Sequence, residues 1–165
     1  MLSRFCFFLI TLFFHSAVFS QNALPDVKVK DLKGNEMPFS SLFEKTGDTA
    51  IIVSFWATWC GPCIKELEAI DENMEEWQKT ATFKVYAVSI DDSRTAGRVK
   101  SFIKGRGWTF PVFQDVNNDL KRALNIPNVP HTLIVRNQKI IYQHDGYLPG
   151  NEEELIEKVR TKTGK

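Results

Sequence analysis

The sequence predicts a single α/β domain in which helices flank a mixed central β-sheet. Three features predict it: a strand-length apolar run at 50–56, a helical pattern directly after it at 61–79, and two strand-like runs joined by a short turn at 131–146. A strand–helix–strand order pairs strands in parallel and a hairpin pairs them antiparallel, so the sheet is mixed. The 165 residues, 43% hydrophobic and 25% charged, suit one globular domain with a sizeable core.

A short hairpin precedes this unit. Residues 27–31 alternate as VKVKD, a Gly-Asn pair supplies a turn, and EMPF follows, which predicts a β-hairpin at the sheet edge. SSLFEK at 40–45 predicts one helical turn capped by one of its two serines. We expect an N-terminal β-hairpin extension over about residues 24–46.

The central elements follow. Residues 50–56, AIIVSFW, are apolar almost throughout, as in a strand buried on both faces. Residues 61–79 predict a helix, and FKVYAVSI at 83–90 predicts the next strand. The helix has apolar side chains at helical spacing, namely Ile64, Leu67, Ile70, Met74 and Trp77.

The second half of the chain completes the sheet. Asp91–Ser93 can cap a helix over about 94–104 that ends at GRG. A short strand at 108–115 and a short helix at 117–126 come next. HTLIVRN and KIIYQHDG form a hairpin across Asn137-Gln138, and NEEELIEKVRTK closes the chain as a helix with acids in its first turn and cations in its last.

The first residues read as a targeting segment. Arg4 is followed by the apolar run Phe5–Phe14 and then by small residues up to Ser20, the order found in a secretory signal peptide. The run is short for a membrane span, which needs about 20 residues. We predict a signal peptide at 1–20 and an exported, periplasmic mature chain at 21–165; if the segment is not cleaved, it is a tether.

Charge argues against polyanionic partners. The chain has 21 basic and 20 acidic side chains, a formal charge of +1. Its aromatic residues do not interleave with Lys and Arg clusters. We therefore expect no nucleic-acid partner.

The cysteines point to redox chemistry. Removal of the signal peptide takes away Cys6 and leaves Cys60 and Cys63. A bridge between them closes a very small loop and stabilises the fold little, which disfavours a structural staple. A zinc site needs about four ligands, and no second CxxC exists, with His131 and His144 the only remaining histidines of the mature chain. We expect no metal and no other cofactor beyond the Cys60–Cys63 dithiol itself.

The spacing explains the chemistry. Cys60 follows the buried strand and Gly61-Pro62 opens a helix, so the Cys60 sulfur is expected at a helix N-terminus. Unpaired N–H groups and the helix dipole favour thiolate there, and such sites lower a cysteine pKa from about 8.5 to roughly 3.5–7.5. Cys63 lies one turn further in. Cys60 is expected to attack a partner disulfide, and Cys63 to release the partner.

FWATWCGPC at 55–63 resembles the active site of the thioredoxin superfamily. With the upstream DLKGNEMPFSSL and the signal peptide, the chain is similar to exported TlpA/ResA-like thiol-disulfide oxidoreductases over about residues 24–162. The resemblance implies a thioredoxin-like fold. It also implies that Pro130 in NVPHTLIV is a cis-proline facing the dithiol, and that the Val129 backbone pairs with a substrate strand; the alternative is an ordinary edge-strand proline. Trp59 is expected to line the rim of this substrate groove.

Glu66 is a candidate for proton transfer. It follows Cys63 by three residues, hence lies on the same helical face, and the resemblance implies that an acid here shuttles protons for the buried thiol. The alternative is a solvated helix glutamate. Three positions depart from the family pattern: Ser54 stands where many thioredoxins have a buried aspartate, Glu68 replaces a kinking proline, and His131 follows Pro130, where it either touches the thiolate or faces solvent.

The Gly-Pro dipeptide between the cysteines is of the thioredoxin type and favours a reductase that reduces disulfides in client proteins. The resemblance implies a membrane electron donor, and we expect a monomer. The alternatives are a dithiol oxidase or isomerase, and a non-enzymatic escort of cysteine-bearing clients such as apocytochrome c. A peroxidase is disfavoured, because its site needs a proline shortly before the cysteine and none lies between Pro38 and Cys60.

Overall fold

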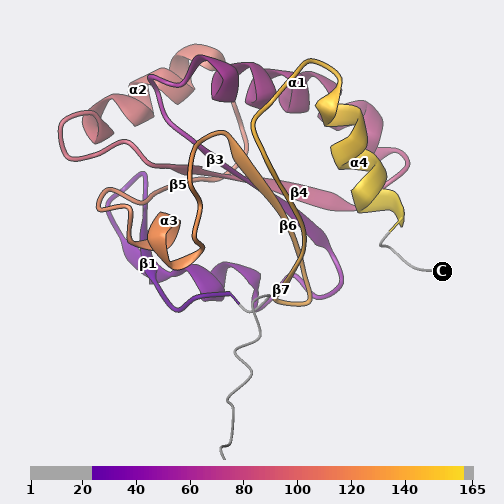
Figure 1. Ribbon diagram of the computed structural model, residues 1–165, viewed down its shortest axis with the longest axis horizontal. Coiled ribbons are helices and arrows are strands. Elements are labelled where there is room, and N and C mark those ends of the chain that lie inside the picture. Colours follow the sequence, from indigo (N-terminus) through magenta and orange to yellow (C-terminus); the bar gives the residue numbers. More distant parts are fainter. Residues whose placement is uncertain (1–23, 162–165) are drawn as a thin grey trace, which may run out of the picture.

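The structure, a computed structural model, describes residues 24–161, so the predicted signal peptide lies outside the described residues. A seven-stranded sheet in the order β2-β1-β5-β4-β3-β6-β7 forms its centre (Figure 1). The strands are β1 (Lys28–Asp31), β2 (Glu36–Pro38), β3 (Ala50–Trp56), β4 (Phe83–Ser89), β5 (Val112–Gln114), β6 (His131–Arg136) and β7 (Lys139–Asp145). The helices are the 3₁₀-helix η1 (Phe39–Phe43), α1 (Gly61–Gln78), α2 (Ala96–Arg106), α3 (Asp119–Ala123) and α4 (Asn151–Thr161).

The sheet is mixed, as predicted. β3, β4 and β5 are parallel neighbours, because helical crossovers connect them. β6 pairs antiparallel with β3, and β7 pairs antiparallel with β6. At the other side β1 pairs antiparallel with β5 and with β2, so the predicted N-terminal hairpin extends the sheet at one edge.

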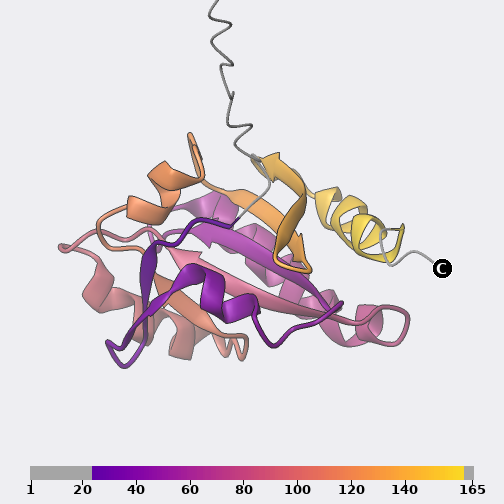
Figure 2. The same ribbon diagram turned by 90° about the horizontal axis from the view of Figure 1, so that it is seen from below.

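Helices cover both faces of the sheet. The crossovers from β3 to β4 and from β4 to β5 step in the same direction, so right-handed connections place α1 and α2 on one face. An ion pair between Glu68 and Arg106 joins these two helices, and α4 packs against α1. η1 lies on the opposite face (Figure 2). Its Phe43 ring contacts the ring of Tyr86 of β4. None of the helices within residues 24–161 combines the length and apolarity that a membrane span requires.

β3 lies at the centre of the core. All seven of its residues are buried, which agrees with its apolar sequence. At its carboxyl end Trp56 packs with Phe102 of α2 and with Trp108, at ring-centroid distances of 5.6 and 5.4 Å. Trp56 and Trp108 are therefore core residues, and the carboxyl end of β3 is held rigidly where the Cys60 segment begins.

The β6–β7 hairpin contains an irregularity. Thr132 lies opposite His144 and Ile134 opposite Tyr142, whereas Val135 lies opposite Ile140. The pairing therefore skips one position of β7 between Ile140 and Tyr142, as in a β-bulge. Every β7 side chain after this point is shifted by one place relative to β6.

Two predicted helix starts were wrong. η1 begins directly after Pro38 without a side-chain cap, and the Ser41 hydroxyl instead donates to the Pro38 carbonyl. α2 begins two residues later than expected, after Thr95, again without a side-chain cap. Asp91, which was expected in that cap, is fully buried and bonded elsewhere.

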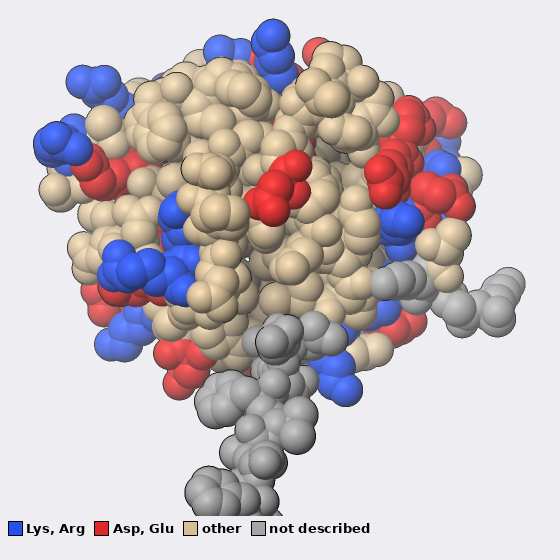
Figure 3. All heavy atoms as spheres, in the orientation of Figure 1, with Lys and Arg blue, Asp and Glu red and all other residues tan. Residues whose placement is uncertain are grey.

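The surface carries both signs of charge. On the face in Figure 3, Lys and Arg side chains lie among Asp and Glu side chains around the margin, and the middle is mostly uncharged. This mixture agrees with the formal charge of +1 and gives this face no broad basic patch.

Candidate active site

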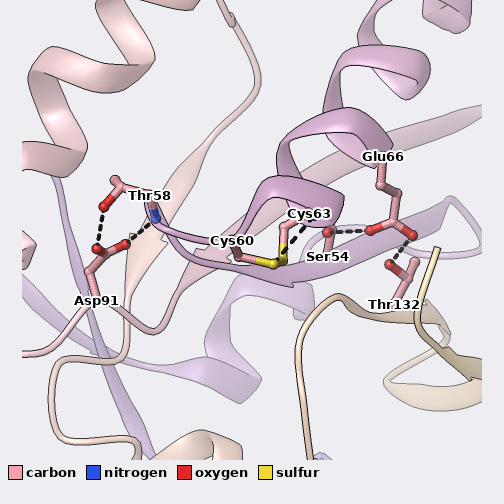
Figure 4. The surroundings of a disulfide bond; sticks show 7 residues. All are labelled: Ser54, Thr58, Cys60, Cys63, Glu66, Asp91 and Thr132. Carbon is pink, nitrogen blue, oxygen red and sulfur yellow. Dashed lines mark hydrogen bonds between the residues drawn. A yellow bond between two sulfur atoms is a disulfide. The ribbon is translucent and has the colours of Figure 1, made fainter.

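Cys60 and Cys63 form a disulfide at the start of α1 (Figure 4). Cys60 is the N-cap of the helix, and Pro62 stands in the first turn, where its missing N–H removes no hydrogen bond. The Cys63 backbone N–H points at the Cys60 sulfur, with N and Sγ 3.3 Å apart. Cys60 is 6% exposed and Cys63 is fully buried. Of the two sulfurs, that of Cys60 is the one presented to a partner.

The helix start favours negative charge on the Cys60 sulfur. The free N–H groups of the first turn and the positive end of the helix dipole both face that atom. In the reduced protein this environment stabilises a thiolate, the form that attacks disulfides. Cys63, enclosed by the core, lies where it can attack only the neighbouring Cys60 sulfur.

Asp91 anchors the turn that leads to Cys60 (Figure 4). Its carboxylate accepts hydrogen bonds from the Thr58 N–H at 2.9 Å, the Thr58 hydroxyl at 2.6 Å and the Ser89 hydroxyl at 2.8 Å. Asp91 follows β4, which is the parallel neighbour of β3, so the ends of both strands meet here. No local sequence pattern indicates this role, because the contact joins residues 33 positions apart.

We expect Asp91→Ala to lower the free energy of unfolding by about 3 kcal/mol. It removes a buried carboxylate with three hydrogen bonds and leaves the Thr58 N–H without its acceptor. Urea unfolding followed by tryptophan fluorescence measures the loss. Asp92→Ala is the control, since its carboxylate bonds mainly to the exposed Arg94, and its stability should stay near that of the unaltered chain. Equal losses in the two variants would contradict the anchoring role.

Glu66 is buried, so the alternative of a solvated glutamate is wrong. Its side chain is 2% exposed. Ser54 donates to one carboxylate oxygen at 3.1 Å, and Thr132 donates to the other at 2.9 Å (Figure 4). The Nε2 atom of His144 lies 3.2 Å from the same oxygen as Thr132. Glu66 thus lies one turn after Cys63 in a closed polar cluster beneath α1.

Strand pairing brings the Glu66 partners together. Ser54 of β3 lies opposite Thr132 of β6, and Thr132 lies opposite His144 of β7, so three strands present these side chains side by side. Thr132 was not a sequence candidate, and His144 was considered only as a metal ligand. A correct register for the three strands would have found both.

Trp59 and Val129 line one hollow beside the disulfide segment. Trp59 is 62% exposed. Lys121 of α3 also lines it, and the remaining lining residues come from the surrounding loops, namely Ile90, Asp92, Arg94, Thr95, Asn118, Pro127 and Asn128. The Val129–Pro130 peptide bond is cis, as the resemblance implied, and Pro130 itself is buried behind Val129.

His131 does not face solvent. It is 4% exposed, its ring packs edge-on against Phe55, and its Nδ1 lies 2.7 Å from an Asp145 carboxylate oxygen. Because strand side chains alternate, His131 projects from the face opposite to Thr132 and the Glu66 cluster. Its role in this structure is to close the end of the β6–β7 hairpin. Glu68, at the position of the missing proline, leaves α1 uninterrupted from Gly61 to Gln78.

The model of the AhpC/TSA family matches residues 20–144, about three quarters of the chain. The chain belongs to the AhpC/TSA family. It has a thioredoxin-like fold.

Three known proteins are similar to the chain. Thiol-disulfide oxidoreductase ResA of Geobacillus kaustophilus is 28% identical over 73% of this chain and 65% of its own length, so the chain spans slightly less than two thirds of it. Thioredoxin-like protein YneN of Bacillus subtilis is 30% identical over 79% of this chain and 74% of its own length. The solution structure of an uncharacterized thioredoxin-like protein from Porphyromonas gingivalis is 41% identical, covers 86% of this chain and 94% of that one, and superposes with a TM-score of 0.75.

Proposed function

We propose that this protein is a thiol-disulfide oxidoreductase that reduces disulfides in client proteins. The observation that carries the proposal is the Cys60–Cys63 disulfide, with one sulfur at the N-terminus of α1 and the other buried behind it. The similarity to a protein named thiol-disulfide oxidoreductase supports it.

The proposed reaction has two exchange steps. The Cys60 thiolate attacks a client disulfide, the client bond breaks, and one client sulfur leaves as a thiolate. The Cys63 thiol then gives its proton to the Glu66 carboxylate and attacks the Cys60 sulfur. The Cys60–client bond breaks, the second client sulfur leaves with the electron pair, and the Cys60–Cys63 disulfide forms. Two electrons pass from the dithiol to the client.

We propose that the client lies in the hollow between Trp59 and Val129. A cis-proline directly after Val129 leaves its backbone at the end of β6, where an extended client segment can pair with it. The exposed Trp59 ring offers an apolar contact on the other side. This arrangement suits a protein segment better than a small disulfide.

Residues 1–20 are proposed to direct export, which places the reaction in the periplasm or tethers it there. An oxidising compartment leaves the dithiol oxidised, so continued reduction requires an electron donor in the membrane. We propose that the exported chain acts as a monomer. Clients of the apocytochrome c kind, with closely spaced cysteines, fit this setting.

The reduction potential of the Cys60–Cys63 couple tests the direction. It is measured by equilibrating the full mature chain with glutathione buffers and trapping thiols with a mass-shifting alkylating agent. A reductase should show a potential near that of thioredoxin, about −270 mV, and a value near that of DsbA, about −120 mV, would make the protein an oxidase. If a Cys60→Ser, Cys63→Ser double variant complements a deletion strain, the protein is instead an escort without redox activity.

Trp59→Ala should raise KM for a disulfide-bearing client protein about tenfold and leave kcat nearly unchanged. The ring is 62% exposed, so its loss removes client contact without opening the core. Steady-state reduction of a scrambled client measures the effect, with a small-molecule disulfide as the control substrate. A similar change in KM for both substrates would argue against a protein-binding hollow.

A further inference from the structure

His144 is the one ring among the groups that hold Glu66. The Glu66 carboxylate accepts hydrogen bonds from the hydroxyls of Ser54 and Thr132. The His144 Nε2 atom lies 3.2 Å from one of its oxygens. The His144 side chain is 18% exposed and the Glu66 side chain 2%. The hydroxyls rotate and can donate or accept, whereas the imidazole has a fixed direction and a defined proton position.

The surroundings decide where that proton lies. The Nδ1 atom of His144 is buried and has no hydrogen-bond partner among the described residues. A proton on Nδ1 would therefore be buried without an acceptor, which is costly. The favoured form has its proton on Nε2 and donates it to Glu66. In that form the ring is neutral and stabilises a carboxylate rather than a carboxylic acid.

Other titratable groups near the pair come from β7, the segment after it, α4 and α1. The ring centroids of Tyr142 of β7 and His144 are 5.7 Å apart. The Tyr142 hydroxyl donates a hydrogen bond to the Glu154 carboxylate of α4. Tyr147, which follows β7, has its pKa raised to about 12 by burial first, then by a hydrogen bond to Glu152 and by the charges of Glu66 and Glu72. Tyr147 therefore stays neutral at physiological pH. Among these neighbours, His144 is the one that donates directly to the Glu66 carboxylate.

We propose that His144 is a positioning residue that keeps Glu66 ionised, so that Glu66 can accept the Cys63 proton in the second exchange step. The inference rests on the proposed function. In that step the proton moves from the Cys63 sulfur to the Glu66 oxygen, the Cys63–Cys60 bond forms, and the client sulfur leaves with the electrons of the broken bond. His144 itself neither gains nor loses a proton. Without this N–H donor the Glu66 carboxylate keeps only its two hydroxyl donors, and release of the Cys63 proton to it becomes slower.

The test is a single-turnover measurement on the full mature chain. The reduced protein is mixed with a disulfide-bearing peptide, and formation and decay of the mixed disulfide are followed by acid quench and mass spectrometry across pH. For His144→Leu we expect the midpoint of the decay step to move up by about one pH unit and its rate below the midpoint to fall about tenfold. His144→Gln, which restores an N–H donor, should recover most of the rate. Formation of the mixed disulfide should not change.

Several results would overturn the inference. One is a folded His144→Leu protein with the pH profile of the unaltered chain; another is a His144→Gln protein as impaired as His144→Leu. If the leucine variant does not fold, infrared spectra of the unaltered chain and of Glu66→Gln at pH 7 provide the test. A carbonyl band of a protonated carboxylic acid that disappears in Glu66→Gln contradicts the proposal. The absence of such a band from the unaltered chain supports it. Failure of the proposed function is distinguishable, because the unaltered chain would then form no mixed disulfide.

Discussion

Cys60→Ser is expected to abolish disulfide reduction, whereas Cys63→Ala should still react once and then stop. Cys60 lies at the N-terminus of α1 and is the more exposed of the two sulfurs, so it makes the first attack. Serine offers a hydroxyl that remains protonated near neutral pH and cannot replace a thiolate. Without the Cys63 sulfur the client remains covalently bound to Cys60.

The two variants are incubated with periplasmic extract. Non-reducing gels and mass spectrometry then measure how much client protein is bound to each by a disulfide. Cys63→Ala should accumulate adducts that a reducing agent releases, and identification of the bound proteins would name the clients. Cys60→Ala is the matched control and should accumulate none. Adducts on Cys63 in that control would reverse the assigned order of attack.

Glu66→Gln is expected to slow release of the client from the mixed disulfide by about a hundredfold. Glutamine has nearly the same shape, but it cannot accept the Cys63 proton. In the unaltered chain the hydroxyls of Ser54 and Thr132 and the imidazole of His144 contact carboxylate oxygens. In the variant, at least one of these groups faces the amide NH₂ instead, which cannot accept a hydrogen bond. The first attack by Cys60 should change less than twofold, because Cys60 lies at the helix N-terminus and does not depend on Glu66.

The same single-turnover assay separates the two steps. Glu68→Gln is the control: Glu68 lies on the same helix, but its side chain is 36% exposed and pairs with Arg106 at the surface. It should react like the unaltered chain. If Glu66→Gln slowed attack and release equally, Glu66 would act on the structure of the whole site rather than on the Cys63 proton.

Local sequence patterns predicted the central elements well. The run at 50–56 coincides with β3, and the helical spacing after Cys60 coincides with α1, because burial on both faces and helical amphipathicity leave clear signals. The start of α2 was predicted less well. Asp91 has the chemistry of a helix cap, but the fold uses it to bind Thr58 across the strand ends, and no local pattern records that preference.

In the site, too, local features were predicted and contacts between distant residues were not. The strand, CGPC segment and helix lie within a few residues of one another, so the sequence predicted the paired cysteines and their environment. The partners of Glu66 lie 12, 66 and 78 positions away and come together only through the pairing of β3, β6 and β7. A prediction made without the strand register left open whether Glu66 is buried or solvated.

The irregularity in β7 determines which side chain reaches Glu66. Counted from the turn, where Arg136 lies opposite Lys139, a regular ladder would place Gln143 opposite Thr132 and His144 opposite His131. The skipped position moves His144 onto the Thr132 side instead. A regular ladder that paired Ile141 with Ile134 would therefore exchange an imidazole for an amide at the carboxylate without altering any residue of the cluster, whereas deletion of Ile141 would leave His144 opposite Thr132. For design or for the divergence of relatives, the bulge at Ile141 therefore determines the chemistry at Glu66 as well as the shape of the hairpin.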